Sequence, residues 1–168
     1  GEEGLLEIAG MLSAPGQGDN SGIEYALGGF SYYVMEAERE DWRKMSERAY
    51  CQALQNAEHE ETRAFLIRQL QVVGGDDAVA CLQGYLGDSR LCGPAARALT
   101  SINRPAASQA LLQALQSAQG DCQLALVEAL GDTRHAAAVT ALVPLASSQD
   151  EKLRKLTLYA LANMADPS

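Results

Sequence analysis

Leucines and alanines recur along this chain at three- and four-residue spacing, which places apolar side chains on one face of an α-helix. The pattern is clearest over residues 121–164, where it reads as three successive helices joined by short turns. Period-two alternation is nearly absent and β-branched residues are few, so strands are not expected. The chain is therefore predicted to be all-α.

The helical pattern repeats along the chain with a period of about thirty residues. Leu70, Leu99, Leu130 and Leu161 occupy equivalent anchor positions on successive helices, and Phe30 occupies the same position further upstream. Self-similarity at this period is typical of stacked helical repeats, in which each amphipathic pair buries its apolar face on its neighbours.

We therefore expect a single repeat domain over residues 1–168, built as a right-handed α–α superhelix of about five antiparallel helix pairs. The approximate bounds of the pairs are 2–36, 39–73, 76–102, 105–132 and 135–164. Gly28 and Gly29 cost stability within a helix, which predicts a kink or an unusually close backbone contact at that point.

The turns and anchors of these pairs resemble the HEAT-repeat signature, in which a turn aspartate and an arginine precede an Ala-Leu on the second helix. The last pair carries the signature as Asp150, Arg154, Ala160 and Leu161, and the equivalent positions earlier in the chain are Arg63 and Asp88. Pro144 lies inside the helix expected at 135–148, where HEAT repeats often have a kinking proline. The resemblance is strongest over 76–164, and it implies a HEAT-like, PBS-lyase-type α-solenoid with a concave binding face. It specifies the fold and hardly specifies the function.

Several strings also resemble the helical-repeat segment of large exported bacterial proteins that carry a C-terminal β-sandwich domain of 3-keto-glycoside hydrolase type. These strings are AYCQAL, RAFLIRQLQ, RLCGPAARAL and KLRKLTLYALANM. This resemblance implies a repeat module of an exported, periplasmic protein whose chemistry belongs to another domain. A turn expected at residues 165–168, of the kind that leads to another helix, fits such a module boundary.

The resemblance to HEAT repeats also implies which residues bind, because the second helices of such arrays line the concave face. Exposed positions are expected two residues before and after each anchor. The candidate binding residues are Tyr32, Arg68, Arg97, Ser101, Glu128, Asp132, Tyr159 and Asn163. Arg68 and Arg97 beside Glu128 would form a charge-alternating ladder suited to a polar peptide or an acidic group. The alternative is a solvated face whose ion pairs contribute little.

Six of the nine aromatic residues lie between Tyr25 and Tyr50. Aromatic clusters with polar groups are common binding hot spots and sugar-stacking surfaces. The other interpretation is a core patch that seals the N-terminal end of the array. We expect the core patch, because Phe30 occupies an anchor position.

The net charge of −9 is concentrated in one part of the chain. Residues 1–61 hold thirteen acids and four bases, whereas residues 62–168 hold nine of each. An acidic N-terminal part repels phosphate backbones, so nucleic-acid binding is not expected. HEAT-like DNA glycosylases, which need a basic, aromatic-lined concave face, are disfavoured for the same reason. The sequence contains no run of eighteen apolar residues, so we expect no membrane insertion.

No catalytic residues, metal site or cofactor are predicted. His59 and His135 lack the convergent ligands that a metal needs, and no motif for a nucleophile or a phosphate loop occurs. We therefore expect a non-enzymatic scaffold that binds a protein partner, or other domains of the same polypeptide, through its concave face. Two alternatives remain open: a bilin-lyase-like protein with a small ligand in the groove, and an accessory module of a carbohydrate-active enzyme.

The four cysteines contain no Cys-x-x-Cys spacing, which argues against zinc and against a redox motif. One interpretation treats them as small buried hydrophobic residues. The other pairs Cys92 with Cys122, or Cys51 with Cys81, because the repeat places each pair at similar heights on neighbouring helices. A disulfide between either pair would require an oxidising compartment.

Overall fold

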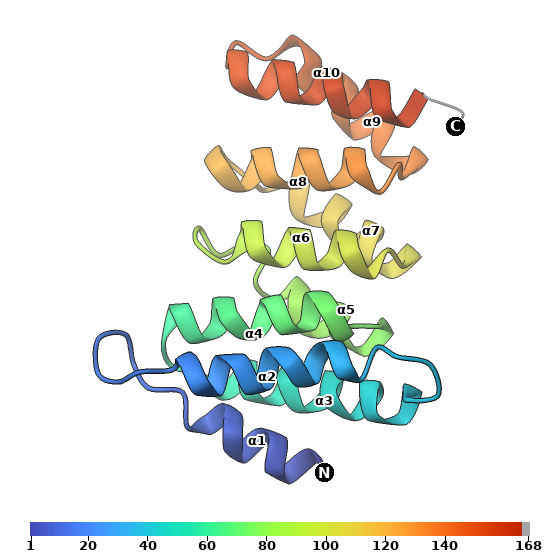
Figure 1. Ribbon diagram of the computed structural model, residues 1–168. Coiled ribbons are helices and arrows are strands. Elements are labelled where there is room, and N and C mark those ends of the chain that lie inside the picture. Colours follow the sequence, from blue (N-terminus) through green and yellow to red (C-terminus); the bar gives the residue numbers. More distant parts are fainter. Residues whose placement is uncertain (166–168) are drawn as a thin grey trace. The chain divides into compact units, whose positions relative to one another are not determined.

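The computed structural model describes residues 1–165, and this part of the chain is helical with no β-strand. The all-α prediction is confirmed (Figure 1). The turn expected at residues 165–168 lies, in its last three residues, outside the described part. The chain divides into two compact units, residues 1–82 and 83–168, which are described separately as unit 1 and unit 2.

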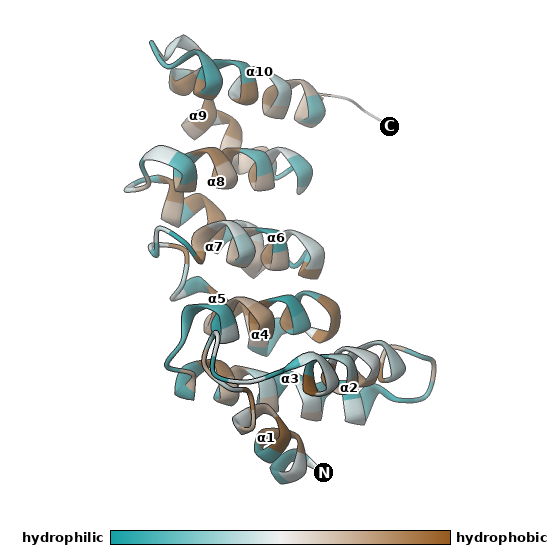
Figure 2. Cartoon of the chain, turned by 60° about the vertical axis from the view of Figure 1, so that its left-hand side comes forward, coloured by the Kyte–Doolittle hydropathy of each residue, from teal (hydrophilic) through white to brown (hydrophobic). Residues whose placement is uncertain are grey.

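Unit 1 contains four longer helices and most of a fifth. These are α1 (Glu2–Gly10), α2 (Ser21–Tyr33), α3 (Glu40–Asn56), α4 (Glu60–Val73) and α5 (Asp76–Gln83). Helix α1 packs against α2 and α3, and α4 packs against the same two helices (Figure 1). The helices are amphipathic, with hydrophobic and hydrophilic positions alternating around each of them (Figure 2). Leu27 on α2, Leu54 on α3 and Leu70 on α4 are fully buried, and the removal of such apolar surface from water is the main stabilising contribution.

A small polar network lies inside the core of unit 1. Ser31 on α2 donates a hydrogen bond to Oε1 of Gln69 on α4 (3.0 Å), and the Tyr50 hydroxyl on α3 donates to the Leu27 carbonyl (3.1 Å). Ser31 and Tyr50 are completely buried, and the Tyr50 hydroxyl also lies 3.0 Å from Ser31 Oγ. The network links three helices, and it satisfies hydroxyl groups that would otherwise destabilise an apolar core.

The turn between α4 and α5 is held by two charged residues of α3. Oε1 of the buried Glu47 accepts hydrogen bonds from the backbone N–H groups of Gly75 and Ala78, both at 2.7 Å. Arg43 donates to the carbonyl of Val73 at the end of α4 (2.5 Å). The anion thus lies at a helix N-terminus and the cation at a helix C-terminus, which is the favourable arrangement for both helix dipoles.

Unit 2 contains the remaining helices. These are α6 (Cys92–Ile102), α7 (Pro105–Leu115), α8 (Gly120–Asp132), α9 (Val139–Leu142) and α10 (Glu151–Ala165), with 3-10 helices at Ala136–Ala138 and Val143–Ser147. Helix α8 packs against α6, α7 and α10 (Figure 1). The anchors Leu99 and Leu130 are fully buried and Leu161 is half-buried, so the three positions face inward as the periodicity predicts.

Helices α8 and α10 approach closely at one glycine. A Cβ atom on Gly131 would lie 2.7 Å from Cβ of Ala160 and 2.8 Å from its Cα. Real Cβ atoms do not approach that closely, so a side chain at position 131 would push the two helices apart. Gly131 and Ala160 therefore set the spacing of this pair of helices.

The prediction of a single helix over residues 135–148 is wrong. The segment consists of two 3-10 helices on either side of the four-residue α9. Pro144 has no backbone N–H to donate and its ring restricts the preceding residue, so an α-helix does not continue through it. The proline ends the helix where a kink was expected.

The expected effect of Gly28 and Gly29 is also wrong. Helix α2 runs through both glycines without interruption. A Cβ atom on Gly28 would meet only Oε1 of Gln69, at 4.0 Å, and one on Gly29 would meet nothing within 4 Å. Neither glycine is required for a close contact.

None of the helices in residues 1–165 has the length and apolar character needed to cross a bilayer.

Candidate functional site

Three predicted binding residues occupy the same position on three neighbouring helices of unit 2. Arg97 lies on α6, Glu128 on α8 and Tyr159 on α10, each two residues before the anchor of its helix, and all three are exposed. Because α8 packs against both α6 and α10, these side chains belong to adjacent helices. We call this set the second-helix row. Tyr159 is 72% exposed, which is unusual for a large aromatic side chain.

The second-helix row is widened by three exposed polar residues one turn further along the same helices, namely Ser101, Asp132 and Asn163. Neither Arg97 nor Glu128 forms an ion pair within the described part of the chain. Their charges are therefore solvated and accessible to a ligand. An arginine, a carboxylate and a tyrosine together can bind a polar peptide by charge-assisted hydrogen bonds and by contact with the ring.

The remaining two predicted residues, Tyr32 and Arg68, lie in unit 1. Tyr32 on α2 is 70% exposed, and the exposed Arg68 on α4 places its guanidinium 5.7 Å from the ring centroid of Phe65. The charge ladder expected from Arg68 to Glu128 has members in both units. Arg68 lies in unit 1, whereas Arg97 and Glu128 lie on the adjacent helices α6 and α8 of unit 2.

The aromatic cluster of unit 1 is not the core patch that we expected. Tyr25 is 84% exposed and Trp42 is 54% exposed, whereas Tyr50 alone among the six is fully buried. Phe30 is half-buried, with its ring centroid 6.2 Å from those of Tyr33 and Trp42. Helix α2 contributes Leu27 and Ser31 to the core, so its large aromatic residues remain on the outer side.

An apolar cavity of about 340 Å³ lies beside this aromatic cluster, within unit 1. Its walls come from α1, α2 and α3, and the principal lining side chains are Leu5, Ile8, Leu27, Phe30, Trp42 and Met45. The sequence indicated the aromatic residues of this surface. It did not indicate that α1 supplies the opposing wall, because that depends on how α1 packs against α2 and α3.

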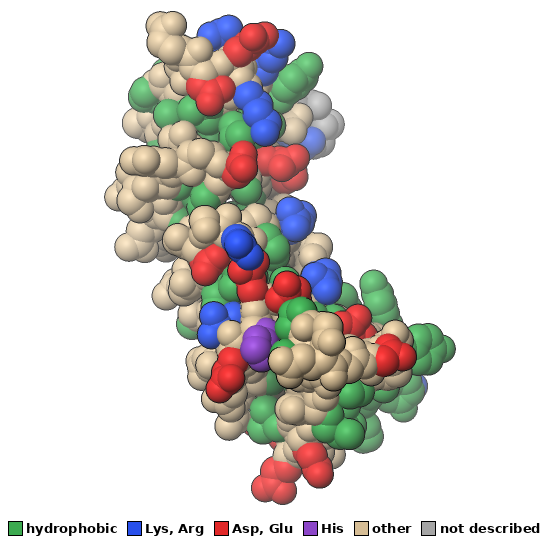
Figure 3. Space-filling model, turned by 90° about the vertical axis from the view of Figure 1, so that its left-hand side faces the viewer, with side chains coloured by type: hydrophobic (Ala, Val, Ile, Leu, Met, Phe, Trp, Pro, Cys, Tyr) green, Lys and Arg blue, Asp and Glu red, His purple; other side chains and the backbone are tan. Residues whose placement is uncertain are grey.

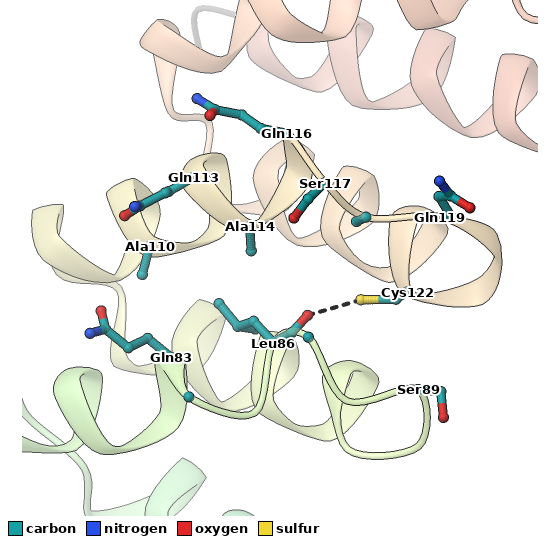
Figure 4. Close-up of a pocket in the computed structure, with 13 residues that line it drawn as sticks. Gln83, Leu86, Ser89, Ala110, Gln113, Ala114, Gln116, Ser117, Gln119 and Cys122 are labelled. Carbon is teal, nitrogen blue, oxygen red and sulfur yellow. Dashed lines mark hydrogen bonds between the residues drawn. The ribbon is translucent and has the colours of Figure 1, made fainter.

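A larger groove, of about 940 Å³, lies in unit 2 between the segment after α5 and helix α7 (Figure 4). Its polar lining is uncharged and consists mainly of Gln83, Ser89, Gln113, Gln116, Ser117 and Gln119. Gln83 and Gln113 lie at one end, Gln119 and Cys122 lie at the other, and Leu86 projects between them (Figure 4). Sequence reasoning missed this groove. The available signal was the three-residue spacing of Gln113, Gln116 and Gln119.

The structure distinguishes the two predicted cysteine pairs. Cys92 and Cys122 form a disulfide that joins α6 to α8, with their Cα atoms 5.6 Å apart. Cys51 and Cys81 are free thiols. A hydrogen bond between them lowers the pKa of Cys81 and raises that of Cys51, and burial adds to the rise at Cys51. The structure therefore brings both pairs together, and only Cys92 and Cys122 are covalently joined.

Residues 1–165 contain no group of three or more His, Cys, Asp or Glu side chains arranged to hold a metal ion. A comparison of the chain with protein-family models and with curated proteins finds no match. What the chain binds is therefore inferred from the surfaces described above.

Proposed function

We propose that this chain is a HEAT-like α-solenoid module, a right-handed superhelix of about five helix pairs, that binds a protein partner without catalysing a reaction. The partner is a separate protein or another domain of the same polypeptide. The binding face is the second-helix row of unit 2, on α6, α8 and α10. The disulfide between Cys92 and Cys122 supports an oxidising compartment, such as the periplasm, as its location.

Equivalent turn residues make equivalent hydrogen bonds, which supports the repeat assignment. Asp88 and Asp150 each lie eleven residues before an anchor leucine. Asp88 accepts hydrogen bonds from the backbone N–H groups two and three residues later, and Asp150 does the same. Arg63 and Arg154 each donate to a backbone carbonyl six residues earlier. Side chains that repeat both their spacing and their bonding are expected of one structural unit used several times.

The observation that carries the binding proposal is the exposure of Tyr159 beside two solvated charges of opposite sign, Arg97 and Glu128. Tyrosine and arginine are the side chains most enriched at the energetic centres of protein interfaces. A tyrosine loses little conformational entropy on binding, because it has only two side-chain torsions. The second-helix row therefore combines an aromatic anchor with polar groups that fix orientation.

The proposal is tested by selecting short peptides from a displayed library on the immobilised chain, and then measuring their affinity for variants. Tyr159→Ala and Arg97→Glu are each expected to lower the affinity for the selected peptides at least about tenfold. A loss of this size is typical when an interface hot-spot residue is removed. Gln109→Glu is the control, because Gln109 is exposed on α7, a helix that carries no residue of the second-helix row. Peptides that bind all three variants as well as the unchanged chain would refute this binding face.

A second candidate function is favoured by the glutamine-lined groove of unit 2. Amide and hydroxyl groups without charge suit a neutral polar ligand such as an oligosaccharide, as expected of an accessory module of a carbohydrate-active enzyme. Titration of neutral oligosaccharides, followed by NMR of the glutamine side-chain amides, tests this candidate. Shifts confined to the groove and abolished by Gln113→Ala are expected, and unchanged spectra would eliminate it.

A further inference from the structure

The apolar cavity of unit 1 is open to solvent beside exposed hydrophobic side chains. Its lining residues Trp42 and Ile8 are 54% and 39% exposed, and the neighbouring Tyr33 is 45% exposed. In the lower part of Figure 3, which is unit 1, hydrophobic side chains gather next to acidic ones. Contiguous exposed apolar surface of this kind usually marks a site of interaction.

The charge around this cavity is strongly one-sided. Every base of residues 1–61 is paired: Arg39 with Glu36, Arg43 with Glu40 and Glu47, Lys44 with Glu40, and Arg48 with Glu2. The helices that wall the cavity also carry exposed acids that form no ion pair with any residue of 1–165, namely Glu3, Glu7, Glu24 and Asp41. Unit 1 holds fifteen acids and six bases, whereas unit 2 holds seven of each. The basic residues of unit 1 therefore neutralise only part of its negative charge.

The walls of the cavity also restrict the kind of ligand. They are α-helices, whose backbone groups are already hydrogen-bonded, so an extended peptide would find few main-chain partners there. An amphipathic helix satisfies its own backbone and presents bulky apolar residues at i, i+3, i+4 and i+7 to a groove. Lysines or arginines beside that apolar face would meet the unpaired acids of α1, α2 and α3.

We propose that the cavity formed by α1, α2 and α3 of unit 1 is a docking site for a basic amphipathic helix of a partner protein. This site is separate from the second-helix row and uses different residues. A second copy of the chain is a poor occupant, because its own unit 1 would bring the same excess of negative charge. An anionic membrane surface is repelled for the same reason.

The only tryptophan of the chain, Trp42, lines the cavity and reports its occupancy. The probe is a synthetic 18-residue helical peptide of Leu, Lys and Ala, with leucines at i, i+3, i+4 and i+7 and no tryptophan. The same peptide with Glu in place of Lys is its comparison. We expect the basic peptide to shift Trp42 emission to shorter wavelength in a saturable manner, and the acidic peptide to produce no shift. Raising the salt concentration is expected to lower the affinity of the basic peptide for the chain several-fold, because salt screens the attraction between the charges.

Gly4→Leu tests the location of binding without disturbing the fold. Gly4 lines the cavity, and a Cβ atom there meets nothing within 4 Å, so a leucine fills the space and also favours the helix. This variant is expected to bind the basic peptide with an affinity at least tenfold lower than that of the unchanged chain. The matched control is Gly10→Leu, the same change at another open glycine of α1 that does not line this cavity, and its affinity is expected to be unchanged.

Three results would overturn the proposal. The first is the absence of saturable binding by the basic peptide. The second is equal binding of the basic and acidic peptides, or equal weakening by both leucine variants. The third is a dimer in sedimentation experiments that Gly4→Leu dissociates, which would assign the cavity to a second copy of the chain.

Discussion

Oε1 of Glu47 on α3 lies 2.7 Å from the backbone nitrogen of Ala78, so a buried carboxylate caps α5 from thirty-one residues away in sequence. The same oxygen accepts the N–H of Gly75, and Oε2 lies 3.4 Å from Nη1 of Arg43. The start of α5 therefore depends on the packing of α3 against the end of α4, which ties the two elements into one cooperative part of unit 1.

Replacing Glu47 with alanine is expected to destabilise unit 1 by about 3 kcal/mol, because two buried N–H groups and Arg43 lose their acceptor. Glu47→Gln retains an oxygen acceptor and is expected to cost less. Urea unfolding followed by Trp42 fluorescence measures both effects. Glu7→Gln is the control, since Glu7 is exposed and forms no ion pair in the described part of the chain, so its replacement is expected to change stability little. Equal stability of the Ala variant and the unchanged chain would contradict the capping role.

Gly131→Ala is expected to destabilise unit 2 by about 1–3 kcal/mol, because the new methyl group would overlap Ala160. Adding Ala160→Gly removes the contact with the Ala160 Cβ but leaves its Cα at 2.8 Å, so the double variant is expected to recover only part of the loss. Gly93→Ala is the control within the same unit, as its Cβ would make only an ordinary contact at 3.6 Å. Urea unfolding followed by circular dichroism gives the comparison, and additive effects of the two changes would argue against direct contact.

Reduction of the disulfide is expected to lower the stability of unit 2 by about 3–4 kcal/mol, since Cys92 and Cys122 close a loop of 30 residues. The urea midpoint with and without reductant measures this loss. The double variant Cys51→Ser with Cys81→Ser is expected to retain the full response to reductant. A response abolished by that variant would place the disulfide on the other pair.

The two free thiols, Cys51 and Cys81, are expected to differ in their reactivity toward alkylating reagents. Because their hydrogen bond lowers the pKa of Cys81 and raises that of Cys51, Cys81 is expected to be alkylated first near neutral pH. Cys51→Ala removes the hydrogen-bond donor and is expected to slow the reaction of Cys81. Peptide mapping after brief treatment with iodoacetamide identifies the modified residue. Faster modification of Cys51 would reverse the assignment.

Burial raises the pKa of Tyr50 above its ordinary value of 10.0. The unfolded chain therefore loses this proton at a lower pH than the folded chain, so stability present below pH 10 declines as the pH rises further. Tyr50→Phe is expected to cost about 1–2 kcal/mol near neutral pH, through the hydrogen bond to Leu27, and to reduce the alkaline decline. Urea midpoints measured from pH 8 upward test this, and identical pH profiles for the two chains would refute the assignment.

Features that depend on local spacing were predictable from the order of residues alone. Apolar residues every three or four positions predict where each helix runs, and their repetition correctly predicted burial of Leu99 and Leu130. The same periodicity brought Cys92 and Cys122 to corresponding places on neighbouring helices, where they form a disulfide. Such features are readable because helix periodicity and repeat register are encoded by residues close together in the chain.

The neighbours of each helix face, in contrast, became known from the packing of the folded chain. The aromatic residues around Phe30 were expected in the core, yet Tyr25 on α2 and Trp42 on α3 are largely exposed, because other residues of these helices, such as Leu27 and Ala49, are the ones buried in the core. The cavity beside Trp42 and the cap that Glu47 provides likewise depend on partners dozens of residues away. Helix propensity states which residues share a face, whereas packing between distant segments determines whether that face is buried, solvated or open to a ligand.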